Sequence, residues 1–226
     1  MKTTLFNIKS RFLSILVILA AILSPIAVQA QNSYLFASVN GNGQNSGGSV
    51  FQYTPPGAQT TFAPGLSRPR GLAFYQGYLY VVMNTVDPVT GNEQESIVKV
   101  SASGVQTPFA TLSVVNFAAE GLAIDGAGNV FVLAFDLTSP VLASTIFKFT
   151  PSGAESTFAT DLADPRGIAF DPSGDLLVAE LKAAAPGDIL KFSTNGSQTV
   201  FASGIGLPQG NGGPEFLAFR GGPALP

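Results

Sequence analysis

The sequence predicts an all-β fold assembled from four copies of one four-stranded unit. An apolar triplet recurs four times, beginning at Leu72, Leu122, Ile168 and Leu217, with spacings of 50, 46 and 49 residues. Short apolar runs and turns rich in Gly, Pro and Ser follow the first three copies. No window of a dozen residues has a 3.6-residue periodicity, so helices are not expected. Four-stranded repeats of about 48 residues are typical of a β-propeller.

The clearest copy of the first two strands lies between residues 165 and 180. Ile168–Phe170 and Leu176–Ala179 are short apolar runs on either side of the sequence Asp-Pro-Ser-Gly. Proline presets φ at the second position of a turn, and glycine accepts a positive φ at the fourth. The segment therefore predicts a strand, a tight turn and a second strand.

The third and fourth strands of each unit have patterns of their own. The third strand alternates apolar residues with an outward lysine, which is the period-two pattern of a half-exposed strand. A turn ending in glycine follows, and then a Thr-Phe-Ala-like run. Each unit is thus predicted to be an antiparallel meander. One phenylalanine recurs in the fourth strand, and we interpret it as core filler between units rather than as a stacking platform. Its copies are Phe62, Phe109, Phe158 and Phe201.

The two ends of the chain supply parts of one further unit. Residues 34–37, 50–53 and 61–63 match the second, third and fourth strands, whereas residues 216–219 match the first strand alone. We therefore expect the N- and C-terminal strands to complete one blade and close a four-bladed ring, which would hide the sheet edges. The predicted repeats are about 33–71, 72–121, 122–167 and 168–220.

Residues 1–30 are predicted to be a secretory signal peptide. A basic start precedes an almost entirely apolar run over residues 12–23, and Val28 and Ala30 are small residues at positions −3 and −1 of a cleavage site. The alternative is a single membrane anchor, which the shortness of the run and Pro25 disfavour. The remaining chain has no apolar run long enough to span a membrane. We therefore expect a secreted or periplasmic protein.

Residues 31–226 form the predicted single propeller domain. Removal of the signal peptide changes the formal net charge from −3 to about −6, which disfavours nucleic acid and anionic membranes as partners. The chain has no cysteine, so it folds without disulfides, and it has no histidine. A Ser-His-Asp triad, a cysteine nucleophile and a histidine zinc site are therefore excluded. We assign no catalytic residue.

The pattern Pro-x-Gly-φ-Ala-Phe-Asp-x-x-Gly-x-φ-φ-Val-Ala (φ being apolar), followed by φ-x-Lys-Phe and Thr-Phe-Ala, resembles NHL-type propeller repeats. These are related to gluconolactonase/senescence-marker propellers, and the chain looks most like secreted bacterial and cyanobacterial proteins, some encoded beside scytonemin synthesis. The resemblance covers nearly all of residues 33–220 and implies the fold. It says little of function, because propellers include enzymes, adhesins and scaffolds. Relatives usually have six blades or more.

The resemblance implies that the first strand of each unit lines a central channel. The loops after each second strand are long and would share one face, which is where we expect a functional surface. Residues two places before the inner runs would alternate in charge around the channel mouth. They are Arg70, Glu120, Arg166 and Glu215. We interpret them as a structural ion-pair ring, with a small-ligand or metal site, or chance, as alternatives.

The leading functional hypothesis is a non-catalytic binding or scaffold module without a cofactor. Its partner would be a protein, a glycan or a small molecule bound at the long-loop face. The alternative is a lactonase of the gluconolactonase type, in which Glu120, Glu215 and Asn116 hold Ca²⁺ or Mg²⁺. Arg70 and Arg166 in the same ring would repel such a cation.

Two loop motifs have simpler alternatives. Residues 87–95 carry carboxylates that could bind calcium, but they lack the regular spacing of a calcium loop, so a solvated insertion is favoured. Asn195-Gly196-Ser197 fits an N-glycosylation sequon and also a plain turn. Because the repeat already demands a turn at this place, the turn is the favoured interpretation.

Overall fold

The computed structural model describes residues 34–41, 47–55, 57–139, 143–182, 186–206 and 213–217. All of them belong to one compact unit, Tyr34–Pro226. The predicted signal peptide, residues 1–30, lies outside the described residues. No helix within the described ranges is long and apolar enough to cross a membrane.

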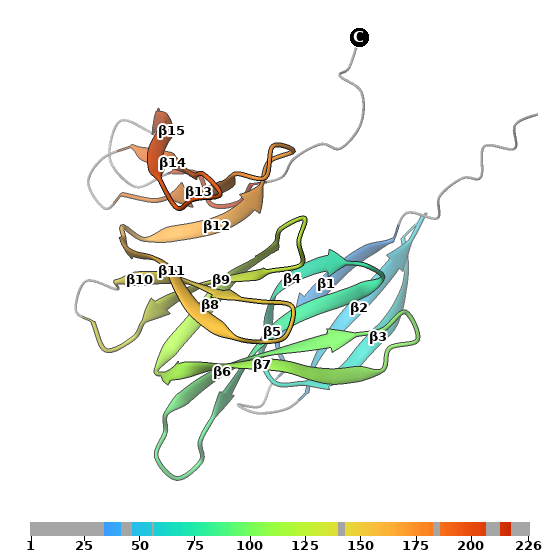
Figure 1. Ribbon diagram of the computed structural model, residues 1–226. Helices are drawn as coiled ribbons and strands as arrows, with labels where there is room; N and C mark the ends of the chain where they lie inside the picture. The colour runs from blue at the N-terminus through green and yellow to red at the C-terminus, as the bar shows by residue number, and fades with distance from the viewer. Residues whose placement is uncertain are drawn as a thin grey trace, which may run out of the picture. The chain divides into compact units, whose positions relative to one another are not determined.

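The described chain folds into four antiparallel sheets that follow one another in sequence order (Figure 1). We name them blade A (β1–β3), blade B (β4–β7), blade C (β8–β11) and blade D (β12–β15). Blade A has three strands among the described residues, and the other blades have four. The strands are β1 (Leu35–Val39), β2 (Gly48–Thr54), β3 (Ala58–Leu66), β4 (Pro69–Tyr75), β5 (Tyr78–Val86), β6 (Glu93–Val100), β7 (Gln106–Val115), β8 (Phe117–Ile124), β9 (Val130–Asp136), β10 (Ser144–Phe149), β11 (Glu155–Leu162), β12 (Pro165–Phe170), β13 (Leu176–Glu180), β14 (Gly187–Phe192) and β15 (Gln198–Ile205).

The repeat predicted from the sequence is confirmed in its strand content and pairing. Each sheet is a meander in which every strand pairs with its sequence neighbour, and blade A begins with the second strand of the unit. The predicted C-terminal strand differs in part, because residues 213–217 belong to no strand. Residues 218–219 lie outside the described ranges. Closure of the ring by the two termini therefore stays a prediction.

The turn between the first two strands of blade D forms as its sequence predicts. Asp171 Oδ1 accepts hydrogen bonds from the backbone amides of Ser173, at 2.8 Å, and Asp175, at 3.0 Å. Gly174 has a φ of 86°, a conformation that disfavours other residues. Asp125 binds the backbone of the corresponding turn in blade C in the same way. An aspartate that binds its own turn therefore recurs between the first two strands.

Glycines bring the inner strands β4, β8 and β12 close together. A Cβ atom at Gly71 would lie 2.9 Å from the backbone nitrogen of Leu122, and one at Gly121 would lie 3.3 Å from the Ile168 side chain. At Gly167 the nearest atom would be the Glu215 carbonyl oxygen, 2.6 Å away. Residues 213–217 therefore follow β12 as the next inner strand of the ring would.

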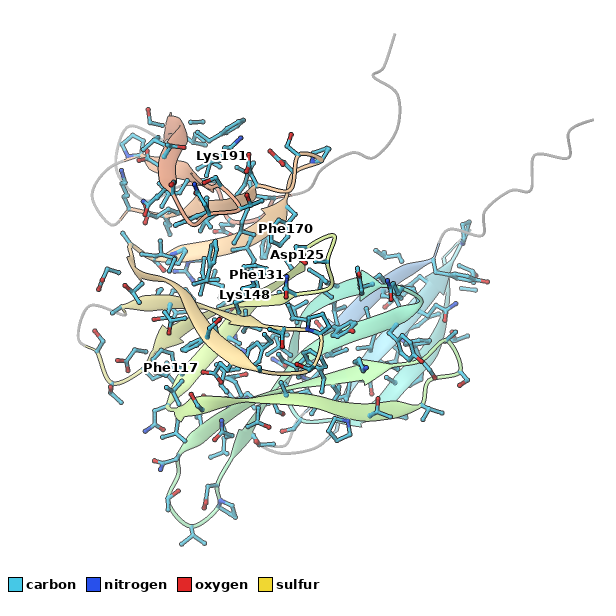
Figure 2. The ribbon with its side chains drawn as sticks, viewed as in Figure 1. Phe117, Asp125, Phe131, Lys148, Phe170 and Lys191 are labelled. Atoms are coloured by element: carbon cyan, nitrogen blue, oxygen red, sulfur yellow. The ribbon has the colours of Figure 1, made fainter. Side chains whose placement is uncertain are left out.

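Three hydrophobic clusters fill the spaces between consecutive blades. In the cluster between blades C and D, the ring centroid of Phe131 lies 5.0 Å from that of Phe158, edge to face. The Phe170 ring lies at the same centroid distance from Phe131, also edge to face (Figure 2). The Lys148 ammonium lies 5.4 Å from the Phe131 ring centre. The recurring phenylalanine is core filler in blades A, B and C, as predicted. It is not so in blade D, where Phe201 is 59% exposed.

Candidate functional site

A cavity of about 510 Å³ lies where the inner strands begin, at their long-loop end. Strands β4, β8 and β12 supply most of its wall, and β1 and the C-terminal segment supply the rest. Its lining residues are Phe36, Ala37, Ser38, Arg70, Gly71, Leu72, Glu120, Gly121, Leu122, Arg166, Gly167, Ile168, Phe216 and Leu217. The charged side chains among these are two arginines and one glutamate, and apolar side chains make up much of the remainder.

Arg70 and Glu120 form an ion pair across the β4–β8 contact. Arg70 Nη1 donates to Glu120 Oε1 at 2.6 Å, and both side chains are about one-third exposed. The Ser38 hydroxyl donates to the Arg70 carbonyl oxygen at 2.8 Å, which connects β1 to β4 at the same level. The close approach at Gly71 places the two charged residues opposite each other. Their charges therefore largely cancel within the cavity wall.

Arg166 pairs with a different carboxylate from the one that the alternating ring implies. Its guanidinium lies 2.9 Å from the carboxylate of Asp164, in the β11–β12 link, and 5.7 Å from the centre of the Phe135 ring. A second cavity of about 160 Å³ adjoins the first and shares Glu120 and Arg166 with it. Arg166 thus lines both cavities, and its side chain is 40% exposed.

The structure does not bring the other two predicted residues into this site. Glu215 is exposed, and its side chain is not among those lining the cavity. Asn116 lies at the β7–β8 corner with a φ of 61°, and its Oδ1 accepts a hydrogen bond from the Glu93 amide at 3.1 Å. Among the described residues, no group of three His, Cys, Asp or Glu side chains could hold a metal ion. The complete ion-pair ring stays a prediction.

A buried polar cluster beside the cavity was missed by sequence reasoning. Asn84 on β5 donates to Glu95 Oε1 at 2.7 Å and to Glu93 Oε2 at 3.0 Å, both on β6. Arg68 donates to Asn84 Oδ1 at 2.7 Å and to Glu93 Oε1 at 3.1 Å. The Ser67 hydroxyl donates to the Asn84 carbonyl oxygen at 2.6 Å. The cluster fastens the β3–β4 link to the long β5–β6 hairpin.

Glu95 is the most perturbed acid in the described chain. Its side chain is 1% exposed, and Oε2 has no hydrogen-bond partner among the described residues. Burial raises its pKa to about 7, against the opposing effects of the Asn84 hydrogen bond, the Ala119 amide and the Arg70 charge. Strand alternation could have found this residue, since Glu95 shares a strand face with buried Ile97.

The two ambiguous loop motifs both form turns. Asp87 Oδ1 accepts from the amides of Val89, at 2.7 Å, and Thr90, at 3.0 Å, and these hydrogen bonds lower its pKa. The Asp87 carboxylate is thus used within its own loop. The expected solvated insertion is wrong for residues 93–95, because they belong to β6 and Glu95 is buried. Asn195 Oδ1 accepts from the Ser197 amide at 3.0 Å in a turn that places Gly196 at a φ of 83°.

No protein-family model matches this chain, and neither does any curated protein. Among solved structures it is similar to a gluconolactonase from Xanthomonas campestris, with 14% identity and a TM-score of 0.51, over 69% of this chain and 55% of that one. The fold is a β-propeller. Other similar structures are regucalcin, a calcium-binding protein from Agrobacterium tumefaciens (11% identity, TM-score 0.42, 75% and 74% covered), and a protein from Lactobacillus plantarum (13%, 0.44, 76% and 67%). The chain spans about half the length of the gluconolactonase.

Proposed function

We propose that the protein is an extracytoplasmic, non-catalytic propeller that binds a small hydroxylated carboxylate, of the sugar-acid class, in the cavity of about 510 Å³. The wall of the cavity carries this proposal, because two guanidiniums, those of Arg70 and Arg166, lie among its lining residues beside a single carboxylate, that of Glu120. Guanidinium binds carboxylate through paired, charge-assisted hydrogen bonds. With Glu120 2.6 Å from Arg70 and Asp164 2.9 Å from Arg166, the site is close to neutral in a chain with a formal net charge of −3.

Arg166 is the residue best placed to bind the ligand carboxylate. Its guanidinium reaches the cavity while the Phe135 ring supports one of its faces. Both arginines are paired, Arg70 with Glu120 at 2.6 Å and Arg166 with Asp164 at 2.9 Å, but the Arg166 side chain is the more exposed, at 40% against 28%. Leu72 and Ile168 offer apolar surface to the C–H face of a sugar-like ligand. Cavities of roughly 300–1,000 Å³ are typical of small-molecule sites.

A lactonase is the competing function, because the similar Xanthomonas structure is a gluconolactonase and the product of lactone hydrolysis is a hydroxylated carboxylate. Such an enzyme would require Ca²⁺ or Mg²⁺ with several oxygen ligands. In the described chain Glu120 is the one carboxylate lining the cavity, and it is paired with Arg70. The two arginines would also repel a cation. The charges of the cavity therefore favour binding over catalysis.

Isothermal titration calorimetry with D-gluconate, and with D-glucose as the neutral analogue, tests the proposal. Wild type should bind gluconate at one site and glucose at least tenfold more weakly. Arg166→Gln should lose at least tenfold in affinity for gluconate, whereas Lys99→Gln, at a lysine that lies over the outer-strand Phe109 ring, should not. Equal affinity for glucose and gluconate, or an unaffected Arg166→Gln variant, would refute the proposal.

Hydrolysis of D-glucono-δ-lactone by the same samples separates the two functions. The binding function predicts hydrolysis at the uncatalysed rate, with or without EDTA. Catalysed hydrolysis that EDTA suppresses and that Glu120→Gln abolishes would replace the binding function with the lactonase.

A further inference from the structure

Consecutive blades pack through the same pair of surfaces at each described interface. We call these the leading surface of one blade and the trailing surface of the next. Between blades A and B, the leading surface of blade A includes Val50, Ala63 and Leu66. The trailing surface of blade B consists of alternate residues of its second and third strands, all of them buried. They are Leu79, Val81, Val98 and Val100.

The trailing surface of blade A is exposed at Leu35, and its other positions, Ala37, Phe51 and Tyr53, are half-buried. In β1 and β2, Leu35 pairs with Tyr53 as Leu79 pairs with Val100 in blade B, so the two leucines occupy equivalent positions. Leu35 is 66% exposed, whereas Leu79 is 1% exposed. Leu176, at the equivalent position of blade D, is also buried. A position that is buried in the other blades is therefore uncovered in blade A.

The outer part of the leading surface of blade D is exposed as well. Phe201 of β15 is equivalent to Phe109 of β7, which packs on Tyr80 in the core between blades B and C. Phe201 and its neighbour Val200 are both exposed. The inner part of blade D is covered, because Gly167 and Gly187 abut residues 213–216. Among the described residues, the trailing surface of blade A is thus uncovered at Leu35 and the leading surface of blade D at Phe201.

We propose that blade D of one copy packs on blade A of a second copy, through Phe201 on one side and Leu35 on the other. The same contact made twice would close two copies into a ring with twofold symmetry. The interface would continue the leading-to-trailing contact already present between blades within the chain. An exposed apolar surface of this kind is typical of an association site.

A second copy fits the observations better than closure of one chain on itself. The main contacts between described blades join β1 to β4, β4 to β8 and β8 to β12. The cavity of about 510 Å³ separates β1 from β12, and closure within the chain would consume it.

Light scattering of the secreted protein tests the proposal. Wild type should have twice the mass of one mature chain. Leu35→Asp and Phe201→Asp should each raise the dissociation constant at least tenfold, whereas Val89→Asp, in an exposed loop, should not. An equimolar mixture of the two interface variants should recover dimers. Each mixed pair would contain one intact contact, between blade D of the Leu35→Asp variant and blade A of the Phe201→Asp variant.

A monomeric wild type would overturn the proposal and favour closure within one chain. Interface variants that remain dimeric, or a mixture that fails to pair although both variants show wild-type circular dichroism, would also overturn it. If either variant fails to fold, the mass of the wild type still decides between one copy and two.

Discussion

Replacing Glu95 by glutamine should stabilise the protein at alkaline pH and change its stability little at acid pH. In the folded state the pKa of Glu95 is about 7, against 4.5 for an ordinary glutamate. The folded protein therefore binds more protons than the unfolded chain between these values. Its stability falls as the pH rises through that window and is fully present below it. At about 1.4 kcal/mol for each pH unit, the charged form costs the fold about 3 kcal/mol.

Glutamine removes this cost at small structural expense. It has almost the same shape, and its amide oxygen can still accept the hydrogen bond from Asn84, which is 2.7 Å long in the wild type. Urea unfolding of both proteins at about pH 5 and about pH 8 measures the effect. The free-energy difference in favour of Glu95→Gln should grow by about 2.5 kcal/mol between these two values. Because other groups titrate alike in both proteins, the difference isolates Glu95. Parallel pH profiles of the two proteins would contradict a raised pKa of Glu95 in the folded state.

Two further predictions concern the inner strands. Gly71→Ala should lower the free energy of unfolding, measured in urea melts, by about 1–3 kcal/mol, because the added Cβ would press on β8. Gly126→Ala, where the added Cβ meets open space, should have little effect. Arg166→Glu should lower the melting temperature by placing like charges together. Because Arg166 pairs with Asp164, adding Asp164→Arg to this variant should restore the melting temperature more fully than adding Glu120→Arg. A larger recovery with Glu120→Arg would favour the alternating ring.

Most of the fold could be predicted because its signals are local. Strand alternation and turns such as the one that ends at Gly174 depend on neighbouring residues, and the repeat confirms each of them several times. The exposure of Phe201 could not be predicted in this way. Repeat equivalence predicts burial only where a following blade covers the position, and coverage depends on how the chain ends are arranged in space.

The candidate site was predicted in part. Spacing placed Arg70, Glu120 and Arg166 at equivalent points of adjacent inner strands, and all three line one cavity. It could not show that Arg166 prefers Asp164, because that choice depends on side-chain conformation and on the path of a short link. Glu95 was missed for another reason: its loop was interpreted as solvated, although strand β6 begins before it and points it inward.

Methyl NMR of the wild type during titration with D-gluconate would locate the binding site directly. The methyl signals of Leu72, Leu122 and Ile168, which line the cavity, should shift together. Signals of Val50 and Leu112, buried in the cores between blades, should stay in place. Shifts confined to residues away from the cavity, or no shift at saturating gluconate, would contradict the claim that this cavity is the binding site.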